Sequence, residues 1–152
     1  MFSHPKKILV ATELAPTSAN EVLSKAAALA DSQDTIDVLY VVDPASVEYT
    51  VDPSFGGSVY EEIYQTAMDN AERRLAALCK PHAVTQGRCH VRYGRVAQEV
   101  HAHIVEGGYD CLIVGSHGRS GWQLLLGSKA TSILHGAPVN TWVVRIKAAE
   151  PR

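Results

Sequence analysis

Two short runs of this chain are apolar at nearly every position, and they constrain the fold more than any other feature. Residues 7–12 read Lys-Ile-Leu-Val-Ala-Thr, and residues 109–115 read Tyr-Asp-Cys-Leu-Ile-Val-Gly. Strands covered on both faces read as continuous apolar runs, whereas strands with one wet face alternate. We therefore expect two central strands of a parallel sheet.

The rest of the chain predicts strands that alternate with helices. Further strands are expected over residues 34–42, 89–93 and 139–146, with 89–93 near a sheet edge because it is short and alternating. With four helices between them, five strands make an α/β fold, an open five-stranded parallel sheet with helices on both faces.

The helix ends are predicted from capping signals. Ser18 with Glu21, and Ser58 with Glu61, match capping boxes that would open the first two helices. The third helix should stop at residues 107–108, two glycines, and the fourth should run from near 128 to near 136. The second helix is expected to face inward with an apolar stripe, namely Tyr60, Ile63, Ala67, Ala71, Leu75 and Leu78.

Length and composition narrow the class of protein. The 152 residues suit one domain, expected over residues 1–147 with a tail at 148–152. A net charge of −2 gives no electrostatic footprint for nucleic acid, and no apolar run is long enough to span a membrane. Three widely spaced cysteines, no secretory leader and no zinc-type pairing predict reduced thiols in a cytoplasmic protein.

A glycine-rich segment follows the strand at 109–115 and leads into the fourth helix. It holds Gly115, Gly118, Gly121 and Gly127 beside three serines. Backbone N–H groups can approach an anion closely there, and the helix start favours negative charge. The segment therefore predicts a nucleotide phosphate cradle, although a plain strand–helix connection would use the same residue types.

Two other chemistries are disfavoured by spacing. Ser120 lies in Gly-Arg-Ser-Gly, one residue short of the GxSxG nucleophile elbow. His101 and His103 are two apart on a predicted helix, so they point about 200° apart and cannot chelate one metal as an i, i+4 pair does. Solvated surface histidines are the expectation.

The segment Gly-Ser-His-Gly-Arg-Ser-Gly followed by Leu-Leu-Leu-Gly-Ser resembles the signature of the universal stress protein family. The resemblance extends over nearly the whole chain, from residues 7–12 to 137–144. It implies strand order 3-2-1-4-5, homodimerisation through the last strand, from Val139 to Ile146, and a cytoplasmic role in stress. Nucleotide-binding members hold ATP through Gly-x2-Gly-x9-Gly-(Ser/Thr).

The chain departs from the binding pattern at two points. Eight residues rather than nine separate Gly118 from Gly127, a loop length nearer the family branch that does not hold ATP. Glu13 stands where nucleotide-binding relatives usually carry aspartate.

The resemblance assigns roles at a crevice where the loops after the first, second and fourth strands open on one sheet edge. Ala11, Thr12 and main-chain groups of Val41 would flank adenine, and Glu13 would meet adenosine polar atoms. The ribose and phosphates of ATP or another adenine nucleotide would meet Gly115, His117, Gly118, Gly127, Ser128 and Lys129. Arg119 would reach over the phosphates or lie in solvent, and a divalent cation such as Mg²⁺ could bridge them.

These expectations combine into a small homodimer that binds an adenine nucleotide for a sensory or regulatory purpose, with slow hydrolysis at most. Two alternatives stay open. One is a dimeric interaction module of the same fold without nucleotide, and the other is a weak nucleotide hydrolase.

Overall fold

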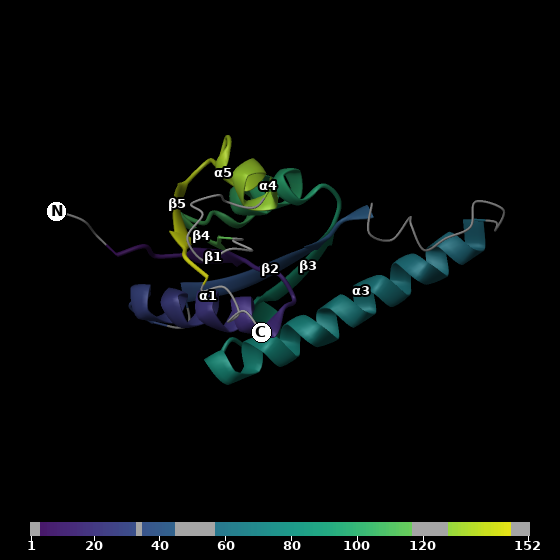
Figure 1. The fold of residues 1–152 in the computed structure, drawn as a ribbon, viewed down its shortest axis with the longest axis horizontal. Coiled ribbons are helices and arrows are strands. Elements are labelled where there is room, and N and C mark those ends of the chain that lie inside the picture. Colours follow the sequence, from purple (N-terminus) through teal and green to yellow (C-terminus); the bar gives the residue numbers. More distant parts are fainter. Residues whose placement is uncertain (1–3, 33–34, 45–56, 117–127, 147–152) are drawn as a thin grey trace, which may run out of the picture.

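The computed structural model describes residues 4–32, 35–44, 57–116 and 128–146, which fold around one parallel sheet (Figure 1). Its order is β3-β2-β1-β4-β5, the order 3-2-1-4-5 predicted above. Every neighbouring pair is parallel, and Val10 in the middle of β1 lies between Val38 of β2 and Ile113 of β4. The strands are β1 (Ile8–Ala11), β2 (Ile36–Val42), β3 (Cys89–Tyr93), β4 (Cys111–Gly115) and β5 (Asn140–Val144).

Helices cover both faces of the sheet. In Figure 1, α1 and α3 lie below the sheet, and α4 and α5 lie above it. Their bounds are α1 (Pro16–Leu29), α3 (Gly57–Cys79), α4 (Val96–Gly107) and α5 (Ser128–Leu134). They correspond to the four helices predicted from the sequence.

The continuous apolar run of β1 is explained by burial on both faces. Ile8, Leu9 and Val10 are all fully buried. Ile8 and Val10 pack in the core on the α1 and α3 side, whereas Leu9 packs in the core on the α4 and α5 side. Successive side chains of a strand point to opposite faces, so each must be apolar here.

The capping boxes are wrong in both helices. The first helix begins at Pro16, with Ala15 in the capping position, and Ser18 lies inside its first turn, where its Oγ donates to the Ala15 carbonyl at 3.2 Å. Proline is favoured at a first helical position because its missing N–H would have no partner there. The described part of α3 already begins at Gly57, so Ser58 does not cap it either.

The structure confirms one further local prediction and corrects two others. Gly108 ends α4 in the left-handed conformation at φ 67°, as the glycine pair predicts. Tyr60 is wrongly assigned to the inward stripe, because it is 40% exposed. The last strand is shorter than predicted, Asn140–Val144 instead of 139–146. Across the described ranges, no helix is both long and apolar enough to cross a membrane.

Candidate functional site

A cavity opens where the carboxyl ends of β1 and β4 meet the start of α5. Six of the predicted site residues line it, namely Ala11, Thr12, Glu13, Val41, Gly115 and Lys129. The other described lining residues are Ser18, Val22, Leu39, Tyr40, Val96, Val100, Val114, Ala130, Ile133 and Ile146.

The strand order places the cavity there. β1 has β2 on one side and β4 on the other, so the chain leaves the centre of the sheet in opposite directions. A parallel sheet opens a crevice at this switch point, beyond the carboxyl ends of its strands. Two backbone hydrogen bonds hold the rim, from Thr12 N to the Leu39 carbonyl at 3.0 Å and from Ser116 N to the Val144 carbonyl at 2.8 Å.

The cavity walls are apolar and the charged groups lie nearer the solvent. Val100, Val114 and Ile133 are buried and belong to the core on the α4 and α5 side. Glu13 is half-buried and Lys129 is exposed. The cavity volume is about 60 Å³, well below that of pockets that enclose a whole drug-sized ligand. The described walls therefore suit one flat, apolar-faced part of a ligand.

Gly115 allows two elements to approach the end of β4. A Cβ atom at this position would lie 2.5 Å from Ile146 Cδ1 and 2.9 Å from Val22 Cγ2, closer than side chains tolerate. All three residues line the cavity. A glycine at this position therefore keeps the floor of the cavity narrow without a steric clash.

Tyr40 was missed by the sequence reasoning, although it directly precedes Val41 in the second strand. It lines the cavity from the side that faces α3. Burial raises the pKa of its phenol, Arg74 opposes the rise, and the negative charges of Glu13 and Asp43 add to it. Charges of both signs thus surround the β1–β2 side of the cavity.

The remaining predicted residues are not tested by the geometry. His117, Gly118, Arg119 and Gly127 lie outside the described residues. Ser128 is the first residue of α5, which has only seven residues. Its backbone therefore starts a helix too short for a strong end charge, since the macrodipole sums over aligned peptide units.

Metal binding finds no support in the described ranges, where no group of three or more His, Cys, Asp or Glu could hold an ion. The prediction of solvated histidines is wrong for both members of the pair on α4. His101 Nε2 donates to the Ile133 carbonyl of α5 at 2.6 Å, and His103 packs in a second polar cluster.

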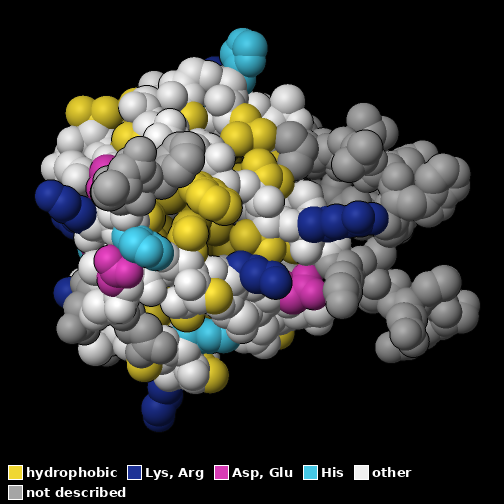
Figure 2. Space-filling model, turned by 90° about the vertical axis from the view of Figure 1, so that its left-hand side faces the viewer, with side chains coloured by type: hydrophobic (Ala, Val, Ile, Leu, Met, Phe, Trp, Pro, Cys, Tyr) yellow, Lys and Arg dark blue, Asp and Glu magenta, His cyan; other side chains and the backbone are white. Residues whose placement is uncertain are grey.

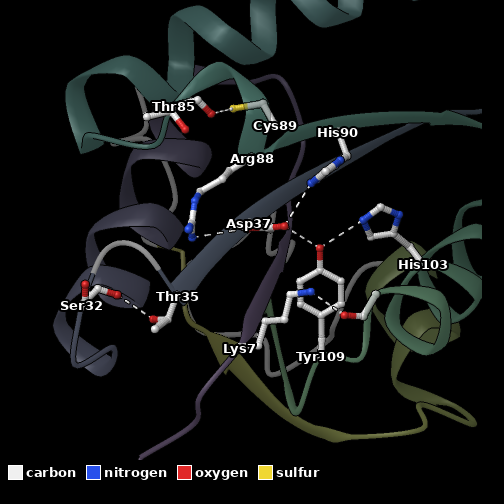
Figure 3. Close-up of polar contacts among 11 residues, drawn as sticks. Lys7, Ser32, Thr35, Asp37, Thr85, Arg88, Cys89, His90, His103 and Tyr109 are labelled. Atoms are coloured by element: carbon white, nitrogen blue, oxygen red, sulfur yellow. Dashed lines mark hydrogen bonds and ion pairs between the residues drawn. The ribbon is translucent and has the colours of Figure 1, made fainter.

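This second cluster lies at the opposite, amino-terminal edge of the sheet (Figure 3). The Tyr109 hydroxyl donates to Asp37 Oδ2 at 2.7 Å, and His90 Nε2 contacts the same oxygen at 3.1 Å. The His103 ring stacks on Tyr109 and lies against His90. Arg92 donates to His103 Nδ1 at 3.3 Å, so the ring is neutral with its proton on Nε2.

The chemistry of the cluster favours a fixed protonation state. Burial, with the nearby His90 and Arg92, lowers the pKa of His103. Burial and the Asp37 carboxylate raise the pKa of Tyr109. Sequence reasoning did not find the cluster because its members come from β2, β3, α4 and the link between α4 and β4, and no local spacing joins them.

Comparison with known proteins identifies the family. The sequence model of the universal stress protein family matches residues 4–145. Universal stress protein A homolog 1 of Coxiella burnetii is 34% identical over 145 residues, 95% of this chain and 99% of that protein. Homolog 2 of the same organism is 31% identical over 144 residues, 95% of this chain and 97% of that protein.

Solved structures share the fold at lower identity. Hypothetical protein MJ0577 superposes with a TM-score of 0.74 at 20% identity, covering 97% of this chain and 100% of its own. A universal stress protein in complex with cAMP gives 0.57 at 15%, over 95% and 100% of the two chains. One from Archaeoglobus fulgidus in complex with dAMP gives 0.54 at 13%, over 93% and 99%. With a family match over almost its entire length, the chain belongs to the universal stress protein family.

Proposed function

We propose that this universal stress protein binds an adenine nucleotide, ATP or a related one, in the cavity at the ends of β1 and β4. The cavity itself carries the proposal, because it gathers six separately predicted residues from three strands and α5 at the switch point of the sheet. Two neighbours of the same fold were solved with adenine nucleotides, which supports the same ligand class.

The base would enter the apolar part of the cavity. Val100, Val114 and Ile133 offer faces for a flat ring, and main-chain groups near Ala11, Thr12 and Val41 offer hydrogen bonds to its edge. Glu13 would accept from a polar group of the adenosine. We extend the resemblance to the phosphates, which would meet Lys129, the backbone at Gly115 and Ser128, and the side chains or backbone of His117, Gly118, Arg119 and Gly127, with Mg²⁺ as a bridging ion.

Binding would serve regulation rather than efficient turnover. Phosphoryl transfer needs a positioned base or water and a stabilised metal. The glycine-rich segment supplies phosphate donors, but its sequence offers no clear base to position attacking water. We therefore propose a sensory role in the stress response, in the cytoplasm, where the free thiols of Cys79, Cys89 and Cys111 would stay reduced.

Thermal unfolding with added nucleotide tests the proposal. AMP, ADP, ATP and cAMP, each with and without Mg²⁺, are compared with ribose phosphate alone. A ligand at 100 times its Kd stabilises by about 2.7 kcal/mol, which corresponds to a rise in Tm of roughly 5–10 °C for a chain of this size. No rise with any nucleotide, and none released from the purified protein on denaturation, would remove the proposal.

The same experiment tests a second candidate function, in which the protein is an interaction module that binds no nucleotide in the cavity. The observation that favours it is the spacing of eight residues between Gly118 and Gly127. A chain that binds no nucleotide but still dimerises would act through its surface alone.

We also propose that two copies pair through the last strand, from Val139 to Ile146. β5 is an edge strand, and its Trp142 and Val143 are 55% and 41% exposed. Figure 2 views the molecule from the side on which β5 lies in Figure 1 and shows apolar side chains gathered in the middle of that face. An unpaired apolar edge invites a partner strand.

Light scattering after gel filtration tests the pairing. The wild type should have twice the mass of one chain, and Trp142→Lys should have the mass of one. Tyr60→Lys is the matched control, because Tyr60 is an exposed aromatic residue on α3, away from β5. A monomeric wild type would refute the pairing.

A further inference from the structure

His101 joins the two helices that wall the nucleotide cavity on one face of the sheet. α4 and α5 pack against each other above the sheet (Figure 1). His101 lies on α4 and is half-buried, and its Nε2 donates a hydrogen bond to the Ile133 carbonyl of α5 at 2.6 Å. Since a carbonyl only accepts, Nε2 of this ring carries a proton.

The Ile133 carbonyl needs a partner from outside its helix. The last four carbonyls of an α-helix have no partner within it, and α5 ends at Leu134. The Leu134 carbonyl accepts from Ala137 N in the following turn at 3.3 Å. The His101 ring lies beside this turn, because a Cβ atom on Gly136, at φ 79°, would lie 4.0 Å from His101 Cε1. His101 therefore caps the end of α5 from a neighbouring helix.

The helix that is held in this way forms one wall of the cavity. Ala130 and Ile133 line the cavity and are buried, and Lys129 lines it nearer the solvent. On α4, Val100 directly precedes His101 and also lines the cavity, whereas His101 is not among the described lining residues. The hydrogen bond thus lies behind the wall and sets the spacing of α4 and α5.

Apolar packing alone would not fix the position of α5. The helix has seven residues, fewer than an isolated helix needs to be stable in water. The Ile133 side chain packs with Val100 and Ile104 in the core, but such packing has no preferred direction. A hydrogen bond constrains both distance and angle. Because the cavity volume is only about 60 Å³, a shift of α5 by about 1 Å would change the space for a ligand.

We propose that His101 is a positioning residue for nucleotide binding. Its hydrogen bond to Ile133 holds α5 at the distance from α4 that the ligand requires. Loss of this bond therefore weakens nucleotide binding, although no contact with the nucleotide is removed. The inference rests on the proposed function, since it concerns the affinity of the same cavity.

Calorimetric titration of the intact protein with AMP and ATP tests the inference in three variants. His101→Leu removes the donor and keeps much of the volume. His101→Asn keeps a polar side chain whose amide is too short to reach the carbonyl, and His101→Gln places an amide N–H near the position of Nε2. We expect binding about three- to tenfold weaker in the first two variants, the effect of losing one hydrogen bond, and within about twofold of the wild type in His101→Gln.

Hydrogen exchange without nucleotide follows the helix itself. The amides of residues 132–135, at the end of α5, should exchange faster in His101→Leu and His101→Asn than in the wild type, because this end of the helix opens more often. His101→Gln should restore the slow exchange. Unchanged exchange in both variants that lack the donor would overturn the inference.

Leu75→Ala is the control for a general loss of stability. Leu75 is fully buried in the core on the α1 and α3 side and does not line the cavity, so the folded variant should keep the wild-type affinity. The inference is overturned if folded His101→Leu and His101→Asn bind as tightly as the wild type, or if Leu75→Ala weakens binding as much as they do. A wild type that binds neither nucleotide removes the proposed function, and the inference with it.

Discussion

Replacing Tyr109 by phenylalanine should destabilise the fold by one charge-assisted hydrogen bond. The hydroxyl donates to Asp37 Oδ2 at 2.7 Å, the tyrosine is 6% exposed, and the Asp37 side chain is 14% exposed. Phenylalanine keeps the ring that stacks on His103 and lies under the Lys7 ammonium. The substitution therefore measures the contribution of the hydroxyl hydrogen bond to stability.

The magnitude follows from what Asp37 retains. A hydrogen bond to a charged group contributes about 1.5–3 kcal/mol. In the variant, Asp37 still has His90 at 3.1 Å and Arg88 at 3.8 Å, so the carboxylate is not left without partners. We expect the lower end, about 1.5 kcal/mol, and a fall in Tm of roughly 3–6 °C.

Urea unfolding followed by circular dichroism measures the loss. Tyr60→Phe on the exposed side of α3 is the control and should change stability by less than about 0.5 kcal/mol. In the Asp37→Asn background, the effect of Tyr109→Phe should shrink, because the acceptor is no longer charged. The reasoning would be refuted if Tyr109→Phe lowered the free energy of unfolding no more than Tyr60→Phe does. It would also be refuted if Tyr109→Phe had the same effect in the wild type and in the Asp37→Asn background.

Three further outcomes are expected. The pKa of His103 is lowered in the fold, so the folded state binds fewer protons than the unfolded chain as the pH drops below about 6.5. The urea midpoint should therefore fall over this pH range. His103→Gln should make the midpoint less dependent on pH, and a variant with the same pH dependence as the wild type would contradict this explanation. Gly115→Ala should cost about 1–3 kcal/mol, because its Cβ meets two cavity side chains, whereas Gly57→Ala meets open space and should change little. Leu75→Ala, at a fully buried site, should cost about 2–5 kcal/mol in the same unfolding assay, and a loss below 1 kcal/mol would contradict the core described above.

The sheet was predictable because each strand is specified by its own residues. Burial on both faces makes β1 and β4 continuous apolar runs, and the pattern of the edge strand Cys89–Tyr93 gave its bounds. Gly108 marked a helix end because a left-handed residue is needed there. The order 3-2-1-4-5 came from the family resemblance, since local patterns contain no information on which strands pair.

The site was only partly predictable. Residues at the ends of strands could be assigned to one edge by topology, and five of them line one cavity together with Lys129 of α5. Ser18 was misread as a cap because its hydroxyl suits either role, although Pro16, a residue type favoured at a first helical position, lies two residues earlier in the sequence. The contact of Asp37 with Tyr109 depends on how elements pack, so no spacing in the sequence predicts it.

Calorimetric titration of the intact protein with ATP, AMP and cAMP tests the central proposal most directly. Ala130→Phe should fill the cavity from α5, and Val105→Phe introduces the same ring at a position on α4 that is 69% exposed and outside the cavity. We predict saturable binding to the wild type and to Val105→Phe, and binding at least tenfold weaker to a folded Ala130→Phe. Equal affinity for all three proteins, or no heat with any nucleotide, would contradict the account.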